Sequence, residues 1–168
     1  GSDLSSTNHN FDAAVLYKIE RFFFSFNAAN ILNKSLKVFD ESEPKKLRNY
    51  YIFTGYTFEV DDGLWELEPS LYFKYFESDQ RSITDVNFKA KRIVDNGYYW
   101  AGLSTRFIND QSFEPLAITP LLGLKKKDFY VGYAFSYNIN EANELNHGGT
   151  HMLTLGSDFE SRRGSPRW

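Results

Sequence analysis

The sequence predicts an all-β fold, an antiparallel up-and-down transmembrane β-barrel, with about nine of its strands present in 168 residues. Aromatic side chains make up 18% of the chain, with 16 Phe and 11 Tyr against one Met, and such side chains suit a pleated, half-buried surface. Apolar and polar residues alternate with period 2 in nine segments, the pattern of strands with two unlike faces. Runs rich in Gly, Asn, Asp, Pro and Lys separate the segments, as expected of turns.

The first three strands begin with a hairpin that joins residues 11–19 to residues 22–29 through a two-residue turn. The second strand of this hairpin aligns three aromatic rings on one face: Phe22, Phe24 and Phe26. A long polar connection over residues 31–47 leads to the third strand, residues 48–60. Its apolar face is formed by Tyr50, Ile52, Tyr56 and Phe58.

The clearest alternation lies in the fourth strand, residues 64–76. One face of it is apolar: Trp65, Leu67, Pro69, Leu71, Phe73 and Tyr75. The other face is mostly polar: Glu66, Glu68, Ser70, Tyr72 and Lys74. Residues 82–94 repeat the pattern as the fifth strand, and the Asn96-Gly97 pair that follows is the signal of a tight hairpin.

Four further strands complete the expected set: residues 98–108, 113–124, 128–139 and 150–159. The sequence thus predicts three parts. Residues 1–10 form an N-terminal extension or a preceding loop, residues 11–159 form the barrel strands, and residues 160–168 form a basic tail.

Connection lengths give the predicted barrel a direction, because short and long connections alternate along the chain. Outer-membrane barrels have tight periplasmic turns and longer external loops, so the last strand and the tail are expected on the periplasmic side. Nine is an odd number, whereas bacterial single-chain barrels normally have an even number of strands. The first residues also carry no secretory signal. We therefore expect a barrel that is incomplete at its N-terminus.

Two other barrels remain open as alternatives. A soluble lipocalin-like barrel would turn its apolar faces inward and bind an apolar ligand, and a passive porin would line a channel with its polar faces. Strands of eleven to thirteen residues exceed the usual length in soluble sheets and suit a tilted crossing of a bilayer, which favours the membrane. The face that carries Trp65, Leu71 and Phe73 distinguishes these alternatives, since it contacts either lipid or a closed interior.

Composition excludes several functions. A formal charge of −3 and a pI near 5.6 do not provide the dominant basic face of a nucleic-acid-binding protein. The chain has no Cys, which removes disulfides and thiolate metal sites. His147 and His151 have the spacing of a helical zinc pair, but the intervening Gly148-Gly149 argues against a helix.

Glu66 and Glu68 are the only pair that suggests acid–base catalysis, being about 7 Å apart on one face of a strand. Four cations share the predicted polar face and offer neutralising partners: Lys74, Lys89, Lys91 and Arg106. That arrangement favours a hydrated, ion-paired wall over a catalytic site. The sequence therefore predicts no enzyme, no bound cofactor and no metal site.

One possible docking surface is basic. It consists of residues expected at the periplasmic end: Lys125, Lys126, Lys127, Arg162, Arg163 and Arg167. A cluster of this kind is more often a solvated turn and tail. Docking to a periplasmic partner is the functional hypothesis for it.

Short aromatic motifs follow one another along the chain. Residues 49–58 hold an aromatic Gly-Tyr strand, and residues 67–75 hold a Pro-Ser pair followed by a lysine. Residues 99–106 contain the motif Trp-x-Gly-x-Ser-x-Arg. Residues 130–135 end in Gly-Tyr-x-aromatic, and residues 148–155 contain Gly-x-His.

In this order the motifs resemble the C-terminal half of the PorP/SprF outer-membrane proteins of the type IX secretion system of Bacteroidetes. The resemblance extends over about residues 11–159. It implies an exported barrel of about twice this length and a non-enzymatic role in type IX secretion or gliding motility. The implied partners are periplasmic lipoproteins and the large surface adhesins that such barrels help to export or anchor.

Overall fold

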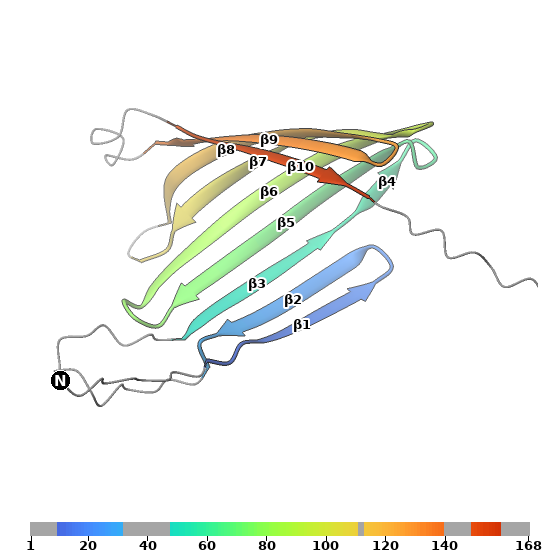
Figure 1. Cartoon of the computed structure of the whole chain (residues 1–168). Helices are drawn as coiled ribbons and strands as arrows, with labels where there is room; N and C mark the ends of the chain where they lie inside the picture. The colour runs from blue at the N-terminus through green and yellow to red at the C-terminus, as the bar shows by residue number, and fades with distance from the viewer. Residues whose placement is uncertain (1–9, 32–47, 111–112, 140–148, 159–168) are drawn as a thin grey trace, which may run out of the picture.

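The structure, a computed structural model, describes residues 10–31, 48–110, 113–139 and 149–158. These residues form one antiparallel sheet of ten strands (Figure 1). The strands are β1 (Ala13–Ile19), β2 (Phe22–Ala29), β3 (Asn49–Tyr56), β4 (Phe58–Val60), β5 (Trp65–Phe76), β6 (Arg81–Val94), β7 (Gly97–Ile108), β8 (Glu114–Lys126), β9 (Phe129–Asn138) and β10 (Thr150–Ser157). Among the described residues there is no helix with the length and apolar character needed to cross a membrane.

The order of strands in the sheet follows the order of the chain, as predicted for an up-and-down fold. The one strand off this path is β4, which pairs with β5 in the register that β3 has already set. Gly55 of β3 faces Ser70, and Phe58 of β4 faces Leu67. The strand predicted over residues 48–60 is therefore present as two strands in one line.

Pro69 explains the break between β3 and β4. In the shared register it stands opposite Tyr56, and a proline has no N–H to donate to a ladder. The next residue, Thr57, bonds on the other side of the strand, where its N–H donates to the carbonyl of Arg21 at 2.9 Å. A second interruption has the same cause, because the β8–β9 ladder is broken at Pro120.

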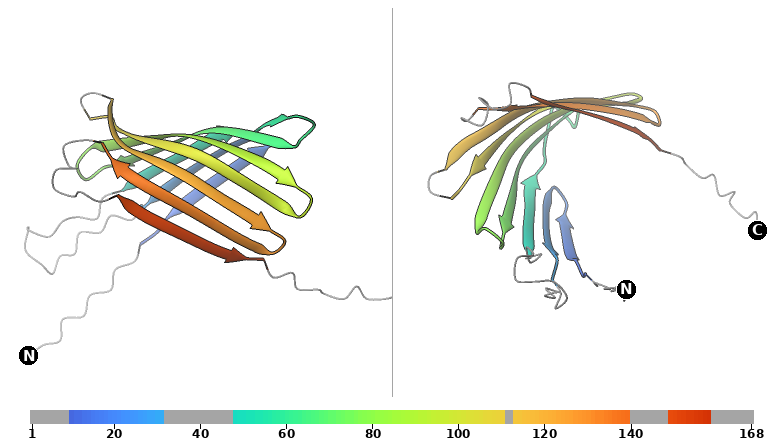
Figure 2. Two further views of the ribbon diagram at one scale, coloured as in Figure 1. Left: turned by 90° about the horizontal axis from the view of Figure 1, so that it is seen from above. Right: turned by 60° about the vertical axis from the view of Figure 1, so that its left-hand side comes forward.

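The sheet is curved but not closed. β1 and β10 stand at the two ends of the strand order, and each pairs with one neighbour in the described part of the chain. Figure 2 shows the resulting open arc. This agrees with the incomplete barrel predicted from the odd number of strands. The arrows of β1 and β10 point toward the same end of the sheet (Figure 1).

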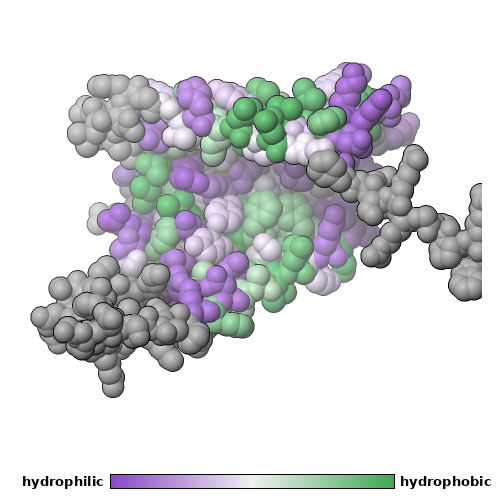
Figure 3. Space-filling model, in the orientation of Figure 1, coloured by the Kyte–Doolittle hydropathy of each residue, from purple (hydrophilic) through white to green (hydrophobic). Residues whose placement is uncertain are grey.

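The two faces of the sheet differ in exposure and chemistry. Leu71 on the predicted apolar face is 46% exposed, whereas Ser70 beside it on the polar face is 8% exposed. Side chains converge on the inside of a curved sheet, so the polar face is the concave one. The space-filling view looks into the concave side of the sheet, where hydrophilic residues are concentrated at both ends (Figure 3).

A hydrophobic core of the soluble kind is not found in the described residues. The buried apolar residues there are three alanines, and no large side chain is fully buried. Large apolar side chains are instead exposed on the convex face, among them Val86, Phe88, Leu103 and Leu122. A single layer with an apolar outside and a polar inside is the arrangement of a barrel wall in a membrane.

Candidate functional site

The strand registers sort nearly all charged side chains to one face. Of the charged residues within the ten strands, all but Arg92 and Lys126 lie on the concave face. The inward set is Lys18, Glu59, Glu66, Glu68, Lys74, Arg81, Asp85, Lys89, Lys91, Arg106, Glu114 and Lys125. The concave face therefore carries most of the charge that these strands could use in a polar function.

Three ion pairs, the inward ladder, connect β5, β6 and β7. Glu66 pairs with Lys91, and Glu68 accepts from the Nζ of Lys89 at 2.7 Å, each pair being directly cross-strand. The third pair is Asp85 with Arg106, also direct partners.

The Asp85–Arg106 pair has the two-point geometry that suits guanidinium and carboxylate groups. The Nε of Arg106 donates to Oδ1 of Asp85 at 2.7 Å, and its Nη2 donates to Oδ2 at 2.8 Å. Asp85 is only 7% exposed, whereas the side chain of Arg106 is 48% exposed. The carboxylate is thus buried in the wall, whereas the guanidinium borders the space on the concave side of the sheet.

The neutralising partners expected for Glu66 and Glu68 are present in part. Lys91 and Lys89 fill that role. Arg106 is taken by Asp85. Lys74 lies over two rings, with its Nζ 4.4 Å from the centroid of Phe76 and 5.4 Å from that of Tyr51. Each glutamate has its own cation, which is the pairing of a structural wall.

Aromatic rings continue the concave wall toward β2. The centroids of Phe23 and Phe53 are 5.0 Å apart, and Tyr72 lies 6.3 Å from Phe53. On the other side of the ladder the wall includes several small residues: Gly102, Gly123, Gly132 and Ala134. The ring of Trp100 lies where a side chain at Gly123 would project. The interior thus has three zones: aromatic, charged and small.

The histidine pair is not described as a pair, because His147 lies outside the described residues. His151 is on the convex face of β10, where its Nδ1 is 2.7 Å from the hydroxyl of Tyr133 and its ring centroid 4.7 Å from that of Phe135. No group of three potential metal ligands occurs in the residues that the structure describes.

The lysines of the expected docking surface lie at the short-turn end but do not act alike. Lys125 faces inward and forms an ion pair with Asp158. Lys126 ends β8 on the convex face, and Lys127 occupies the turn with a φ of 53°. The other three expected members, Arg162, Arg163 and Arg167, lie outside the described residues. Docking by this surface therefore stays a prediction.

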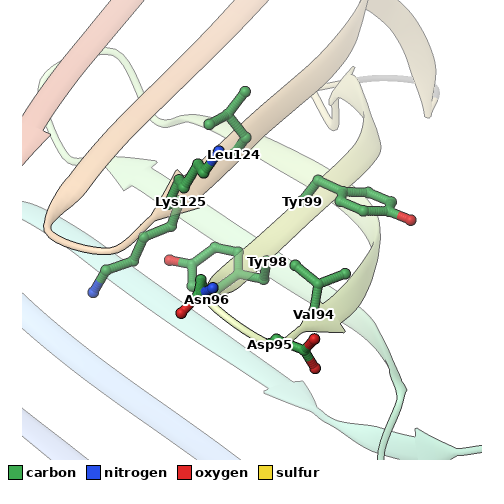
Figure 4. Close-up of a pocket in the computed structure, with 8 residues that line it drawn as sticks. Val94, Asp95, Asn96, Tyr98, Tyr99, Leu124 and Lys125 are labelled. Carbon is green, nitrogen blue, oxygen red and sulfur yellow. The ribbon is translucent and has the colours of Figure 1, made fainter.

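A hollow of about 450 Å³ adjoins these lysines at the tip of the β6–β7 hairpin (Figure 4). Its lining comes from residues 94–96, Tyr98, Tyr99 and residues 124–126. Val94 and Tyr99 project from one side of the hairpin, and Tyr98 and Lys125 from the other (Figure 4).

Arg92 is a residue that the sequence interpretation did not single out. It stands in the even-numbered row of β6, whose other members include Val86, Phe88 and Ala90. A positive charge in an apolar row of an alternating strand was the signal that could have identified it.

Comparison with models of known protein families gives a match over nearly the whole chain. The model of a family described as type IX secretion system membrane protein PorP/SprF matches residues 1–157. No curated protein and no solved structure matches significantly.

Proposed function

We propose that this chain, which belongs to the PorP/SprF family of type IX secretion system membrane proteins, helps to export or anchor large surface adhesins and couples to periplasmic lipoproteins. The family and the fold give the coarser assignment, an outer-membrane component of type IX secretion. The observation that carries it is the sorting of charge to the concave face, because only a wall with lipid on its convex side needs that sorting.

The same observation disfavours a soluble lipocalin-like barrel. Such a barrel would hold an apolar ligand against apolar inner walls. Here Trp65, Leu71 and Phe73 lie on the convex face, and the concave face carries the inward ladder. Transfer of the intact protein from detergent to plain buffer tests this directly. Aggregation is expected, and a monodisperse protein would contradict the membrane assignment.

A non-enzymatic role agrees with the chemistry of the inner wall. The two glutamates that suggested acid–base catalysis are each engaged by a lysine on the neighbouring strand. A general acid or base must be placed to exchange a proton with a substrate, whereas each of these carboxylates is bound to a lysine of the wall.

A passive porin is the second candidate, and the half-exposed guanidinium of Arg106 on the concave face favours it. Conductance of the intact protein in planar bilayers tests this alternative. Steady ion flow supports a porin, and a silent barrel counts against it.

Coupling to the periplasm is assigned here to the short-turn end. With Lys125 held by Asp158, the available cations are Lys126 and Lys127, together with the arginines of the tail. Acidic segments of a partner lipoprotein suit this charge.

The test is affinity purification of the full-length protein from its native envelope, with all six expected docking residues replaced by Gln. Loss of the periplasmic lipoproteins from the eluate is expected. A control for the loss of positive charge elsewhere replaces Arg48 and Arg81, at the opposite end of the sheet, with Gln. Unchanged recovery with the six-residue variant removes the docking role. Surface adhesin in a deletion strain, compared with its complemented strain, tests the export role separately.

A further inference from the structure

Within the ten described strands the convex face carries two cations, Arg92 and Lys126, and both are at the short-turn end. Arg92 lies within three residues of the β6–β7 turn, and Lys126 is the last residue of β8. A charge on the lipid face of a barrel costs about 2–4 kcal/mol at the bilayer midplane and close to nothing at the interface. Their position therefore marks where the hydrocarbon ends on this side.

Aromatic residues surround Arg92 at the same level. It stands directly opposite Trp65 on β5 and Tyr99 on β7, and its Cζ is 5.4 Å from the centroid of the Trp65 ring. Tyr99 is 43% exposed. Trp and Tyr are the residues that prefer the headgroup region, because each has a large apolar body and one polar atom.

Neither cation has an acidic partner within the part of the chain that the structure describes. This distinguishes them from Lys89, Lys91 and Arg106 on the inner wall, each of which has a carboxylate. Arg92 and Lys126 lie on β6 and β8, on either side of β7. A guanidinium suits a phosphate, which accepts two parallel N–H bonds from it, and an ammonium supplies a second positive charge.

The hollow at the hairpin tip supplies the space for a headgroup. Tyr99, Leu124 and Lys126 line it on the side of the convex face, and Leu124 is the cross-strand partner of Tyr99. Asp95 at the tip also lines it and can accept hydrogen bonds from hydroxyl groups. Figure 4 shows Tyr99 and Val94 projecting to the same side as Asp95.

The geometry points to a phospholipid site at the short-turn end, in which an anionic glycerol headgroup lies over β7, with Arg92 on one side of its phosphate and Lys126 on the other, and with Asp95 accepting from its hydroxyls. Trp65, Tyr99 and Leu124 contact the upper part of the acyl chains. The choice of a phospholipid rests on the periplasmic placement of the short turns in the proposed function. It does not rest on which lipoprotein or adhesin the barrel serves.

The experiment is a titration of the intact, full-length protein in detergent with short-chain phosphatidylglycerol, followed by native mass spectrometry. Arg92→Gln with Lys126→Gln is expected to weaken binding about 25-fold, at about fivefold for each cation near a membrane surface. Arg92→Lys keeps the charge but loses the two-point contact, so an intermediate affinity is expected, which separates lost contact from lost folding. Heat-modifiable migration on a gel checks that each variant is folded.

Two comparisons make the result specific. Lys18→Gln with Lys74→Gln removes the same charge from the concave face and is expected to leave binding unchanged. Phosphatidylcholine of equal chain length is expected to bind more weakly, and inorganic phosphate is expected not to displace the lipid. Equal loss in both double variants, equal binding of the two lipids, or displacement by inorganic phosphate would each overturn the proposal. Recovery of lipoproteins with Arg92→Gln alone should be normal, so this site and the docking role fail separately.

Discussion

Among the ion pairs of the inner wall, the one between Asp85 and Arg106 is the pair whose loss by a single substitution is expected to cost the most stability. Replacing Asp85 with Ala leaves the guanidinium on the wall without its carboxylate, and both hydrogen bonds are lost. Because Arg106 is half exposed, water compensates part of that loss, and the expected coupling between the two residues is about 1 kcal/mol.

A double-mutant cycle of Asp85→Ala and Arg106→Ala measures this coupling by urea unfolding in lipid vesicles. The Glu68–Lys89 pair, which joins through a single contact at 2.7 Å, serves as the comparison and should couple less strongly. A coupling of zero for Asp85 and Arg106 would show that the two-point contact does not exist in the membrane.

Gly123 is a second residue whose identity is fixed by its neighbour. A Cβ there would lie 2.5 Å from the Nε1 of Trp100, so any larger residue must displace the ring. Gly123→Val is expected to destabilise the barrel by about 1–3 kcal/mol through overpacking, and Trp100→Leu in the same chain should restore part of it. Gly156→Val is the matched control, since the nearest atoms to its Cβ lie at 3.7 Å. Equal losses at the two glycines would contradict the assigned packing.

At the scale of the strand, Pro69 on β5 causes the break between β3 and β4, which lie beside it in the sheet. The break between β3 and β4 should disappear in Pro69→Ala, because the new N–H can donate across to Tyr56. Hydrogen exchange should then show slower exchange around Tyr56 and Thr57, with the rest of β5 unchanged. Pro120→Ala makes the same change in the β8–β9 ladder and provides an internal comparison. Unaltered exchange around Tyr56 in Pro69→Ala would mean that the interruption has another cause.

The same strand shows what a sequence can and cannot predict. Period-2 alternation placed Trp65 and Leu71 on one face and Glu66 and Glu68 on the other, and the structure has both faces as predicted. The break at Tyr56 was not predicted, since its cause is a proline that meets it only through the register between strands.

Register also decides the partners within the candidate site. The sequence indicated which cations share a face with the two glutamates, but a slip of two residues along β6 would keep every face and change every partner. Lys74 was expected to neutralise a carboxylate and instead lies over aromatic rings. The face on which a side chain lies depends on one strand, whereas its cross-strand partner depends on the register between two strands. Only the face can be deduced from local periodicity.

For the whole molecule, the direction of the two edge strands limits how the wall can close. β1 and β10 run toward the same end of the sheet (Figure 1), so a seam made directly between them would be parallel. Unpaired N–H and C=O groups at a lipid-exposed edge cost several kcal/mol each, so both edges need partners in the membrane. An antiparallel wall requires an odd number of strands between β1 and β10, supplied from outside the described residues.

Cysteine cross-linking in the intact protein tests this directly, because the sequence has no native Cys. Leu71→Cys with Val86→Cys joins direct partners of β5 and β6 and should cross-link, as paired residues have Cα atoms about 4.5–5.5 Å apart. Val15→Cys on β1 with Leu153→Cys on β10 should not, since intervening strands would keep the edges apart. Efficient cross-linking of the second pair would establish a direct parallel seam, and the wall would then close without further strands.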